Sequence, residues 1–234
     1  QSDALGSFEP SWHGHLSDLP DGPLFLVANE YLDALPVRQF IRSGDAWAER
    51  VVGVSGEGGL QFGLTDPLPL AALKDRLAVT TEGDMVTQCN AAAAQVGFLA
   101  ERIRSAGGLG LIIDYGDEEV AGDTFQAVSN HQKVSPLDAP GKADLTAHVE
   151  FRALKKAASE SGAEVSGPIP QGVFLQALGI EQRAGVLAQA LTGDRLEQHL
   201  AATARLTDPD QMGTLFKVMA IHAPDAPPVP GFPC

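Results

Sequence analysis

Two short apolar runs, residues 24–28 and 109–113, constrain the fold of this chain more than any other feature. Each is about five residues long and is closed by polar residues, a pattern typical of strands buried on both faces of a parallel sheet. Between them, residues 88–105 carry apolar side chains at three- and four-residue steps. This spacing predicts a helix with Gly107 as its C-cap. A helix followed by a buried strand indicates an α/β fold.

Other segments add to this frame. Residues 37–54 alternate between apolar and polar side chains around a turn at 43–45, which predicts an antiparallel hairpin inserted after the first buried strand. Further helices are expected at 67–78, 151–161, 171–178, 181–190 and 195–205, and further strands at 163–166 and 213–221. The proline-rich residues 224–230 cannot join a sheet and are expected to form a tail.

The charge balance limits the class of partner. The 234 residues include 16 basic and 30 acidic side chains, a formal charge of −14, which argues against nucleic-acid binding. The acidic charge leaves room for a basic partner, such as an arginine-rich peptide, although in most acidic proteins it only favours solubility. Cys89 and Cys234 have no CxxC spacing, so we expect no disulfide or zinc site and a reducing, intracellular compartment. The chain has no apolar run near the ~20 residues that a membrane span needs.

The densest polar cluster, residues 29–36, directly follows the first apolar run. Ligands of open α/β sheets bind at the carboxyl ends of the strands. Asn29, Glu30 and Asp33 could there hold a cationic group or accept a proton. The alternative is that Asn29 or Glu30 only caps a following turn. Residues 114–116, Asp-Tyr-Gly, take the equivalent place after the second run and could equally be a turn.

A third polar region contains His131, Asp144, Thr146 and His148. The histidines could line a pocket, but their spacing matches no zinc signature, and we expect no metal site. Asp144 or Thr146 is more simply interpreted as a cap of the helix that begins near 151. The chain contains no Gly-x-Gly-x-x-Gly, no P-loop and no Gly-x-Ser-x-Gly. The glycine-rich residues 53–59 follow the hairpin and predict a turn.

Residues 28–40, with the core Asn-Glu-Tyr-Leu-Asp-Ala-Leu-Pro, closely resemble the signature of the MidA-like family. The resemblance continues in family order at residues 113–116, 124–128, 144–149, 171–175, 178–180, 205–207 and 212–218. Members of this family are S-adenosylmethionine-dependent methyltransferases, and one is a mitochondrial arginine methyltransferase that helps to assemble respiratory complex I.

The resemblance implies an α/β fold with the Rossmann-like sheet of class I methyltransferases. Residues 24–28 and 109–113 would be its fourth and fifth strands, and 163–166 and 214–221 its closing antiparallel pair. The sheet would lack its first strands and carry a β-hairpin insertion near 37–60 and a helical insertion near 171–206. Residues 1–221 would thus be a partial methyltransferase domain, followed by a tail at 222–234.

The resemblance also implies an activity, protein arginine N-methylation, in a bacterial cytoplasm or the mitochondrial matrix. Glu30 and Asp33 would orient the guanidinium group and accept its proton, and Asn29 would position the substrate or cofactor. Further residues would line the crevice or cover it: Asp114, Tyr115, Gly116, His131, Asp144, Thr146, His148 and Phe174.

One departure from the family pattern affects the cofactor. In the family, the glycine-rich cofactor loop and an acidic residue lie upstream of the Asn-Glu motif, whereas 28 residues precede Asn29 here. We therefore expect weak or no cofactor binding by this chain alone, and an apolar sheet edge that a missing amino-terminal segment or an oligomer partner would cover. The alternative function is that of a non-catalytic assembly or scaffold protein with a methyltransferase-like fold.

Overall fold

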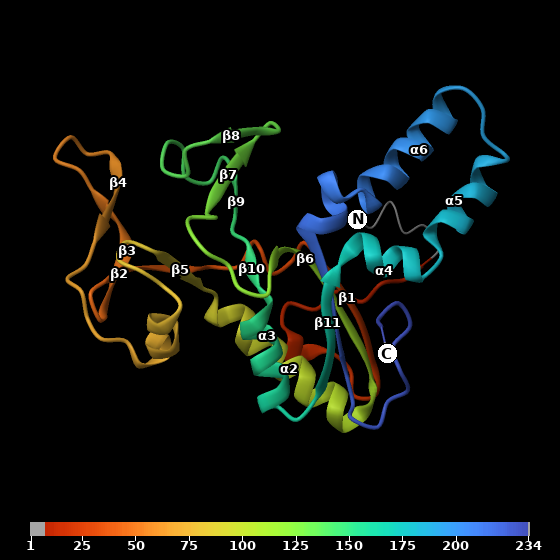
Figure 1. Ribbon diagram of the computed structural model, residues 1–234, viewed down its shortest axis with the longest axis horizontal. Coiled ribbons are helices and arrows are strands. Elements are labelled where there is room, and N and C mark those ends of the chain that lie inside the picture. Colours follow the sequence, from red (N-terminus) through yellow and green to blue (C-terminus); the bar gives the residue numbers. More distant parts are fainter. Residues whose placement is uncertain (1–7, 234) are drawn as a thin grey trace.

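The main sheet of the computed structural model, which describes residues 8–233, is mixed and lies at the centre of the molecule (Figure 1). Its order is β1 (Leu24–Asn29), β6 (Gly108–Asp117), β12 (Phe216–His222) and β11 (Glu164–Pro170). The short strand β10 (Val149–Glu150) pairs with the far end of β6. Strands β1 and β10 run parallel to β6, and β12 runs antiparallel to both β6 and β11. The predicted closing antiparallel pair is thus confirmed.

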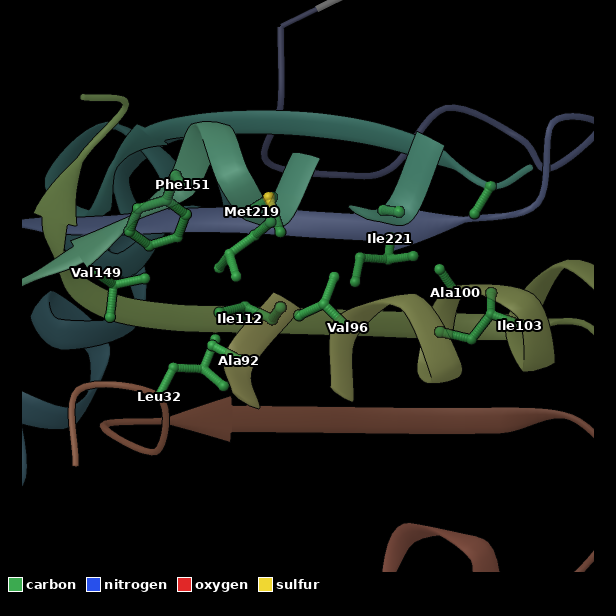
Figure 2. Packing of buried hydrophobic residues seen from close by; sticks show 13 residues of the cluster. Leu32, Ala92, Val96, Ala100, Ile103, Ile112, Val149, Phe151, Met219 and Ile221 are labelled. Atoms are coloured by element: carbon green, nitrogen blue, oxygen red, sulfur yellow. The ribbon is translucent and has the colours of Figure 1, made fainter. Parts of the chain in front are cut away.

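Two helices cover one face of this sheet, α2 (Asn90–Ala106) and α3 (Phe151–Glu160). Figure 2 shows Val96 of α2 and Ile112 of β6 among the side chains between the layers, with Met219 of β12. These three residues are at most 1% exposed. Helix α2 ends as predicted, at Gly107, whose φ of 84° places it in the region that favours glycine.

Strand β1 departs from its predicted burial. Phe25 is 79% exposed and Val27 66% exposed, whereas the alternate residues Leu24 and Leu26 are partly buried. The prediction of a strand buried on both faces is therefore wrong for β1, because none of the described elements covers the second face. Successive side chains of a strand point to opposite faces, so Phe25 and Val27 share the uncovered one.

The insertion after β1 is larger than the predicted hairpin. Strands β2 (Arg38–Ser43) and β3 (Ala46–Val54) form that hairpin, and β4 (Leu60–Leu64) and β5 (Met85–Gln88) extend it into a four-stranded antiparallel sheet of order β4-β3-β2-β5. With the 3₁₀ helix η2 (Ala71–Ala78), this insertion sheet has a small core of its own, made by Phe40, Trp47, Leu73 and Val86. A separate core explains how the insertion can project from the main body (Figure 1).

A third sheet lies between the other two, with order β8-β7-β9 from β7 (Gln126–Ser129), β8 (Gln132–Val134) and β9 (Asp144–Thr146). The predicted helix-cap role of Asp144 or Thr146 is wrong, because both lie in β9, paired with β7. The N-cap of α3 is Glu150, which makes no side-chain capping bond.

The last helices agree with their predicted positions within a few residues. They are α4 (Gln171–Ala177), α5 (Ile180–Ala188) and α6 (Asp194–Thr207), followed by a π-helical turn, η3 (Pro209–Gly213). Near the amino terminus the 3₁₀ turn η1 (Leu16–Asp18) precedes β1. None of the helices within residues 8–233 is long and apolar enough to cross a membrane.

Candidate active site

The carboxyl ends of β1 and β6 lie side by side, so that two of the predicted polar clusters meet at one edge of the main sheet. The strands are parallel, with Asn29 opposite Ile113. The amide of Glu30 continues the ladder by donating to the carbonyl of Ile113 at 3.0 Å. Asp114, the next residue of β6, therefore stands beside the loop that leaves β1. This edge is where open α/β sheets bind ligands.

Asp114 holds that loop in place. Its side chain is 1% exposed, and its Oδ2 accepts the amides of Leu32 and Asp33 at 3.0 and 3.2 Å. Its Oδ1 accepts the amide of Tyr115 at 2.9 Å. The loop lies outside the helices and strands, so these bonds satisfy amides that would otherwise be buried without partners. Leu32 then points into the main core (Figure 2).

Asp33 is the buried carboxylate of the loop, at 6% exposure. Its Oδ2 accepts a 2.6 Å hydrogen bond from the hydroxyl of Tyr115, whereas its Oδ1 has no hydrogen-bond partner among the described residues. The Tyr115 ring is fixed by edge contacts with His148 and Phe216, each at 5.5 Å between ring centroids. A buried polar atom without a partner is uncommon in folded proteins and calls for an explanation, such as a bound ligand.

The electrostatics of the cluster follow from burial and from the proximity of two carboxyl groups. Burial, together with the charge of Asp33, raises the pKa of Asp114 from 3.8 to about 7, against the lowering effect of its three amide bonds. Burial and the bond to Asp33 raise the pKa of Tyr115, so its hydroxyl keeps its proton and acts as a donor. Burial, with the charges of Lys217 and Lys133, lowers the pKa of His148.

A cavity of about 360 Å³, here called the Asp33 cavity, opens beside this carboxylate. One wall is the loop from Asp33 to Val37, and another comes from β9 and the residues next to it, including Thr146. The insertion sheet supplies the outer wall. The volume is at the small end of the range for ligand pockets.

The outer wall carries an ion-pair network that the sequence analysis did not find. Arg50 of β3 forms an ion pair with Asp123. The carboxylate of Asp123 also accepts a hydrogen bond of 3.0 Å from Nε2 of Gln39 in β2. The guanidinium carbon of Arg50 lies 3.7 Å from the ring centroid of Phe62 in β4, a cation–π contact. The signal was available at Gln39, a polar residue inside a strand and within the family-like segment, but the sequence alone did not reveal its partner 84 residues away.

The structure separates Asn29 and Glu30 from Asp33. Both are exposed at the end of β1, and Nδ2 of Asn29 donates to Oε1 of Glu30 at 3.3 Å. Glu30 has a φ of 48° and turns the chain out of the strand. The two residues stand at the predicted sheet edge, but only Asp33 enters a buried setting.

The other predicted site residues divide between the cluster and the periphery. His148 packs on Tyr115, and Thr146 lines the Asp33 cavity. His131 and Asp144 are exposed, His131 in the two-residue turn between β7 and β8. Phe174 is buried in α4 against Phe232 of the tail, 5.2 Å between centroids.

Gly116 has a structural function beside the site. A Cβ at this position would lie 2.0 Å from the carbonyl oxygen of Val149, so only glycine lets β10 pair this closely with β6. That pairing places His148, the neighbour of Val149, next to Tyr115.

These features define an α/β protein with an acidic, partly buried crevice at the carboxyl edge of its sheet. The family model described as "Putative S-adenosyl-L-methionine-dependent methyltransferase" matches residues 1–169. The chain belongs to this methyltransferase family.

Curated relatives agree with that assignment. The mitochondrial protein arginine methyltransferase NDUFAF7 homolog of Drosophila melanogaster is 36% identical over 235 aligned residues, which cover 94% of this chain and 53% of that protein. The human mitochondrial protein arginine methyltransferase NDUFAF7 is 34% identical over 215 residues, 90% of this chain and 48% of that protein. The chain thus spans about half the length of the curated relatives it matches.

A solved structure extends the likeness to the fold. A Burkholderia thailandensis protein crystallised with S-adenosyl-homocysteine is 29% identical with a TM-score of 0.75, over 94% of this chain and 57% of that one. The class I methyltransferase fold expected from the resemblance is therefore confirmed. The strand order β1-β6-β12-β11, with β12 antiparallel, is the corresponding half of the sheet.

The strand-to-helix turns of the described residues differ from a glycine-rich cofactor loop. The turns that lead from a strand directly into a helix within residues 8–233 are those before α2, α3 and α4, and none of them contains a glycine. A glycine loop is what lets main-chain amides approach a nucleotide-like ligand. The free oxygen of Asp33 is instead suited to a hydrogen-bond donor, such as a cationic nitrogen.

Proposed function

We propose that this chain carries the acceptor half of a protein arginine methyltransferase, and that Asp33 receives the guanidinium group of the substrate. The observation that carries the proposal is the unpartnered Oδ1 of Asp33, a 94% buried carboxylate at the wall of the Asp33 cavity. A guanidinium group is planar, keeps its charge at all physiological pH values and donates to carboxylates with strong, directional bonds. The names of the curated relatives support the same acceptor.

In this proposal each residue of the cluster has a distinct task. Tyr115 fixes the carboxylate by its bond to Oδ2, which leaves Oδ1 for the substrate. Asp114 fixes the position of the loop by accepting hydrogen bonds from the backbone amides of Leu32 and Asp33. Holding the acceptor nitrogen in a fixed direction is the main contribution that a protein can make to a displacement at a methyl group.

Asn29 and Glu30, the exposed pair at the end of β1, would act after the methyl group has been transferred. Glu30, held by Asn29, is a carboxylate at the same sheet edge, open to solvent, and could accept the proton released when the nitrogen is methylated. S-adenosylmethionine, when bound, supplies the methyl group. We place the reaction in a bacterial cytoplasm or the mitochondrial matrix.

The test uses a minimal acceptor. Binding of Nα-acetyl-arginine amide to this chain is measured by titration calorimetry, beside the citrulline analogue, which has the same shape without the charge. We expect arginine to bind at least about ten-fold more tightly, and Asp33→Asn to abolish the difference. Equal affinity for the two compounds in the wild-type chain would contradict the proposal.

A further inference from the structure

The outer part of the insertion sheet exposes an unusual amount of apolar surface. In the ribbon formed by β3 and β4, Val52 pairs with Phe62 and Val54 with Leu60, and Arg50 pairs with Leu64. Directly paired residues point to the same face of a sheet, and so do alternate residues along a strand. We call the apolar side of this ribbon the ribbon face; it consists of Val52, Val54, Leu60, Phe62 and Leu64.

The side chains of the ribbon face are open to solvent. Val54 is 71% exposed, Leu64 56% and Val52 53%, and Leu60 and Phe62 are 42% and 37% exposed. Exposed apolar patches of this kind mark interaction sites more often than scattered single residues do. The opposite face of the same strands includes Trp47, which packs into the small core of the insertion. Further along this face, Val51 of β3 pairs with Gly63 of β4.

The ribbon face is continuous with the Asp33 cavity. Val52 and Phe62 belong to both, since they also line the cavity whose inner wall is Asp33. A ligand anchored on the free oxygen of Asp33 would leave the cavity past these two side chains and reach Val54 and Leu60 next. Figure 1 shows β3 and β4 extending outward from the body.

We propose that the ribbon face is the docking surface for the polypeptide that carries the acceptor arginine, an inference that rests on the proposed function. The occupant is an extended segment with apolar side chains at alternate positions beside its arginine. Val52 and Val54 are roughly 7 Å apart along β3, because a strand advances about 3.3 Å per residue, and an extended peptide repeats at the same interval. The chain's charge of −14 favours a cationic segment over a second copy of itself.

The experiment measures binding of synthetic, fluorescein-labelled peptides to the 234-residue chain by anisotropy. The main probe has one arginine followed by three leucines at alternate positions separated by serines. A second peptide has serine in place of the leucines, and a third has citrulline in place of the arginine. The protein variants are the double substitution Val54→Ser with Leu60→Ser, and the control Val51→Ser on the opposite face of the same strand.

We expect the double substitution to weaken binding of the leucine peptide by about ten-fold or more and to leave the serine peptide unchanged. Val51→Ser should bind both peptides as the wild-type chain does. Equal affinity of wild-type and double variant for the leucine peptide would overturn the docking surface. So would self-association of the wild-type chain in sedimentation that the double substitution removes, because the occupant would then be a second copy.

The two proposals fail in different ways. If arginine and citrulline peptides bind alike while the ribbon variants still lose affinity, the ribbon face stands and the arginine-binding role of Asp33 does not. If Asp33→Asn abolishes the preference for arginine while the ribbon variants bind normally, the proposed function stands and the docking surface is refuted.

Discussion

The hydroxyl of Tyr115 holds one oxygen of Asp33 at 2.6 Å, and the other oxygen is buried without a hydrogen-bond partner among the described residues. The bond joins the carboxyl-terminal end of β6 to the loop after β1, across 82 residues of sequence. It makes the tyrosine the residue that determines the direction of the free oxygen.

Removal of this hydroxyl should cost stability. In Tyr115→Phe the carboxylate of Asp33 stays buried with both oxygens unsatisfied, which costs about 1–3 kcal/mol or more for a charged group. We expect a lower midpoint in chemical denaturation and weaker binding of arginine amide. The matched control is Tyr31→Phe, at the chain's other tyrosine, which is 45% exposed. Identical midpoints for the two variants would show that the bond contributes nothing.

Asp33→Asn should separate stability from binding. The amide oxygen of asparagine can still accept the Tyr115 hydroxyl, and the substitution removes a buried charge next to Asp114. We expect thermal stability equal to or above that of the wild type, with loss of the preference for arginine over citrulline. A variant that unfolds at lower temperature would mean that the carboxylate is needed for the fold itself.

Acid should stabilise the cluster through Asp114. The pKa of its carboxyl group is about 7 in the folded chain against 3.8 as the ordinary value, so folding takes up a proton between these pH values. This contribution is fully present below the ordinary value and is lost as the pH rises through about 7. Relative to Asp114→Asn, the wild type should gain stability as the pH falls from about 8 to about 5, with a slope of at most about 1.4 kcal/mol per pH unit.

The control for that pH series is Asp144→Asn, at an exposed carboxylate of β9. This substitution leaves Asp114 in place, so the pH-dependent contribution of Asp114 should persist in the variant. A curve for Asp114→Asn that runs parallel to that of the wild type would contradict the raised pKa of Asp114.

Gly116→Ala should disrupt the pairing of β10 with β6. Its Cβ would lie 2.0 Å from the carbonyl oxygen of Val149, and the backbone has to move to relieve the overlap. We expect a loss of about 1–3 kcal/mol or more in the free energy of unfolding and a changed near-ultraviolet signal from Tyr115. Gly53→Ala is the control, because nothing lies within 4 Å of a Cβ there.

The open face of β1 should influence solubility without influencing stability. Phe25 and Val27 are 79% and 66% exposed, and exchange of both for serine removes apolar surface from solvent. We expect less light scattering at high concentration and a change of no more than about 0.5 kcal/mol in the free energy of unfolding. Leu26→Ser, on the covered side of the strand, should destabilise the chain instead. Unchanged scattering would show that this face takes no part in self-association.

The sequence was sufficient to predict those helices and strands whose apolar residues follow a regular spacing within one segment. The apolar runs became β1 and β6, the three-and-four spacing became α2 and α3, and the resemblance placed β11 and β12 as the closing pair. The two polar clusters met at one sheet edge because neighbouring parallel strands end together. Burial of β1 was mispredicted, since an apolar run does not reveal whether a second layer is present.

What the sequence could not supply were the partners of polar groups that are distant in sequence. Asp144 and Thr146 looked like helix caps because they precede α3, and only the pairing of β9 with β7 shows otherwise. Asp114 was placed in the crevice, but its role as acceptor of the loop amides depends on bonds across 81 and 82 residues. Arg50, Asp123 and Phe62 were missed because they approach one another only in the folded chain.

The residues that line the Asp33 cavity come from separate parts of the fold, which has a consequence for how such a protein can evolve. The carboxylate is fixed from β6, by Asp114 and Tyr115, whereas the entrance is built by the insertion sheet with its independent core. Under the proposed function, substitutions on the insertion would change which polypeptide enters, while the carboxylate of Asp33 would stay in place. The proposed polypeptide specificity could thus evolve separately from the proposed acceptor carboxylate.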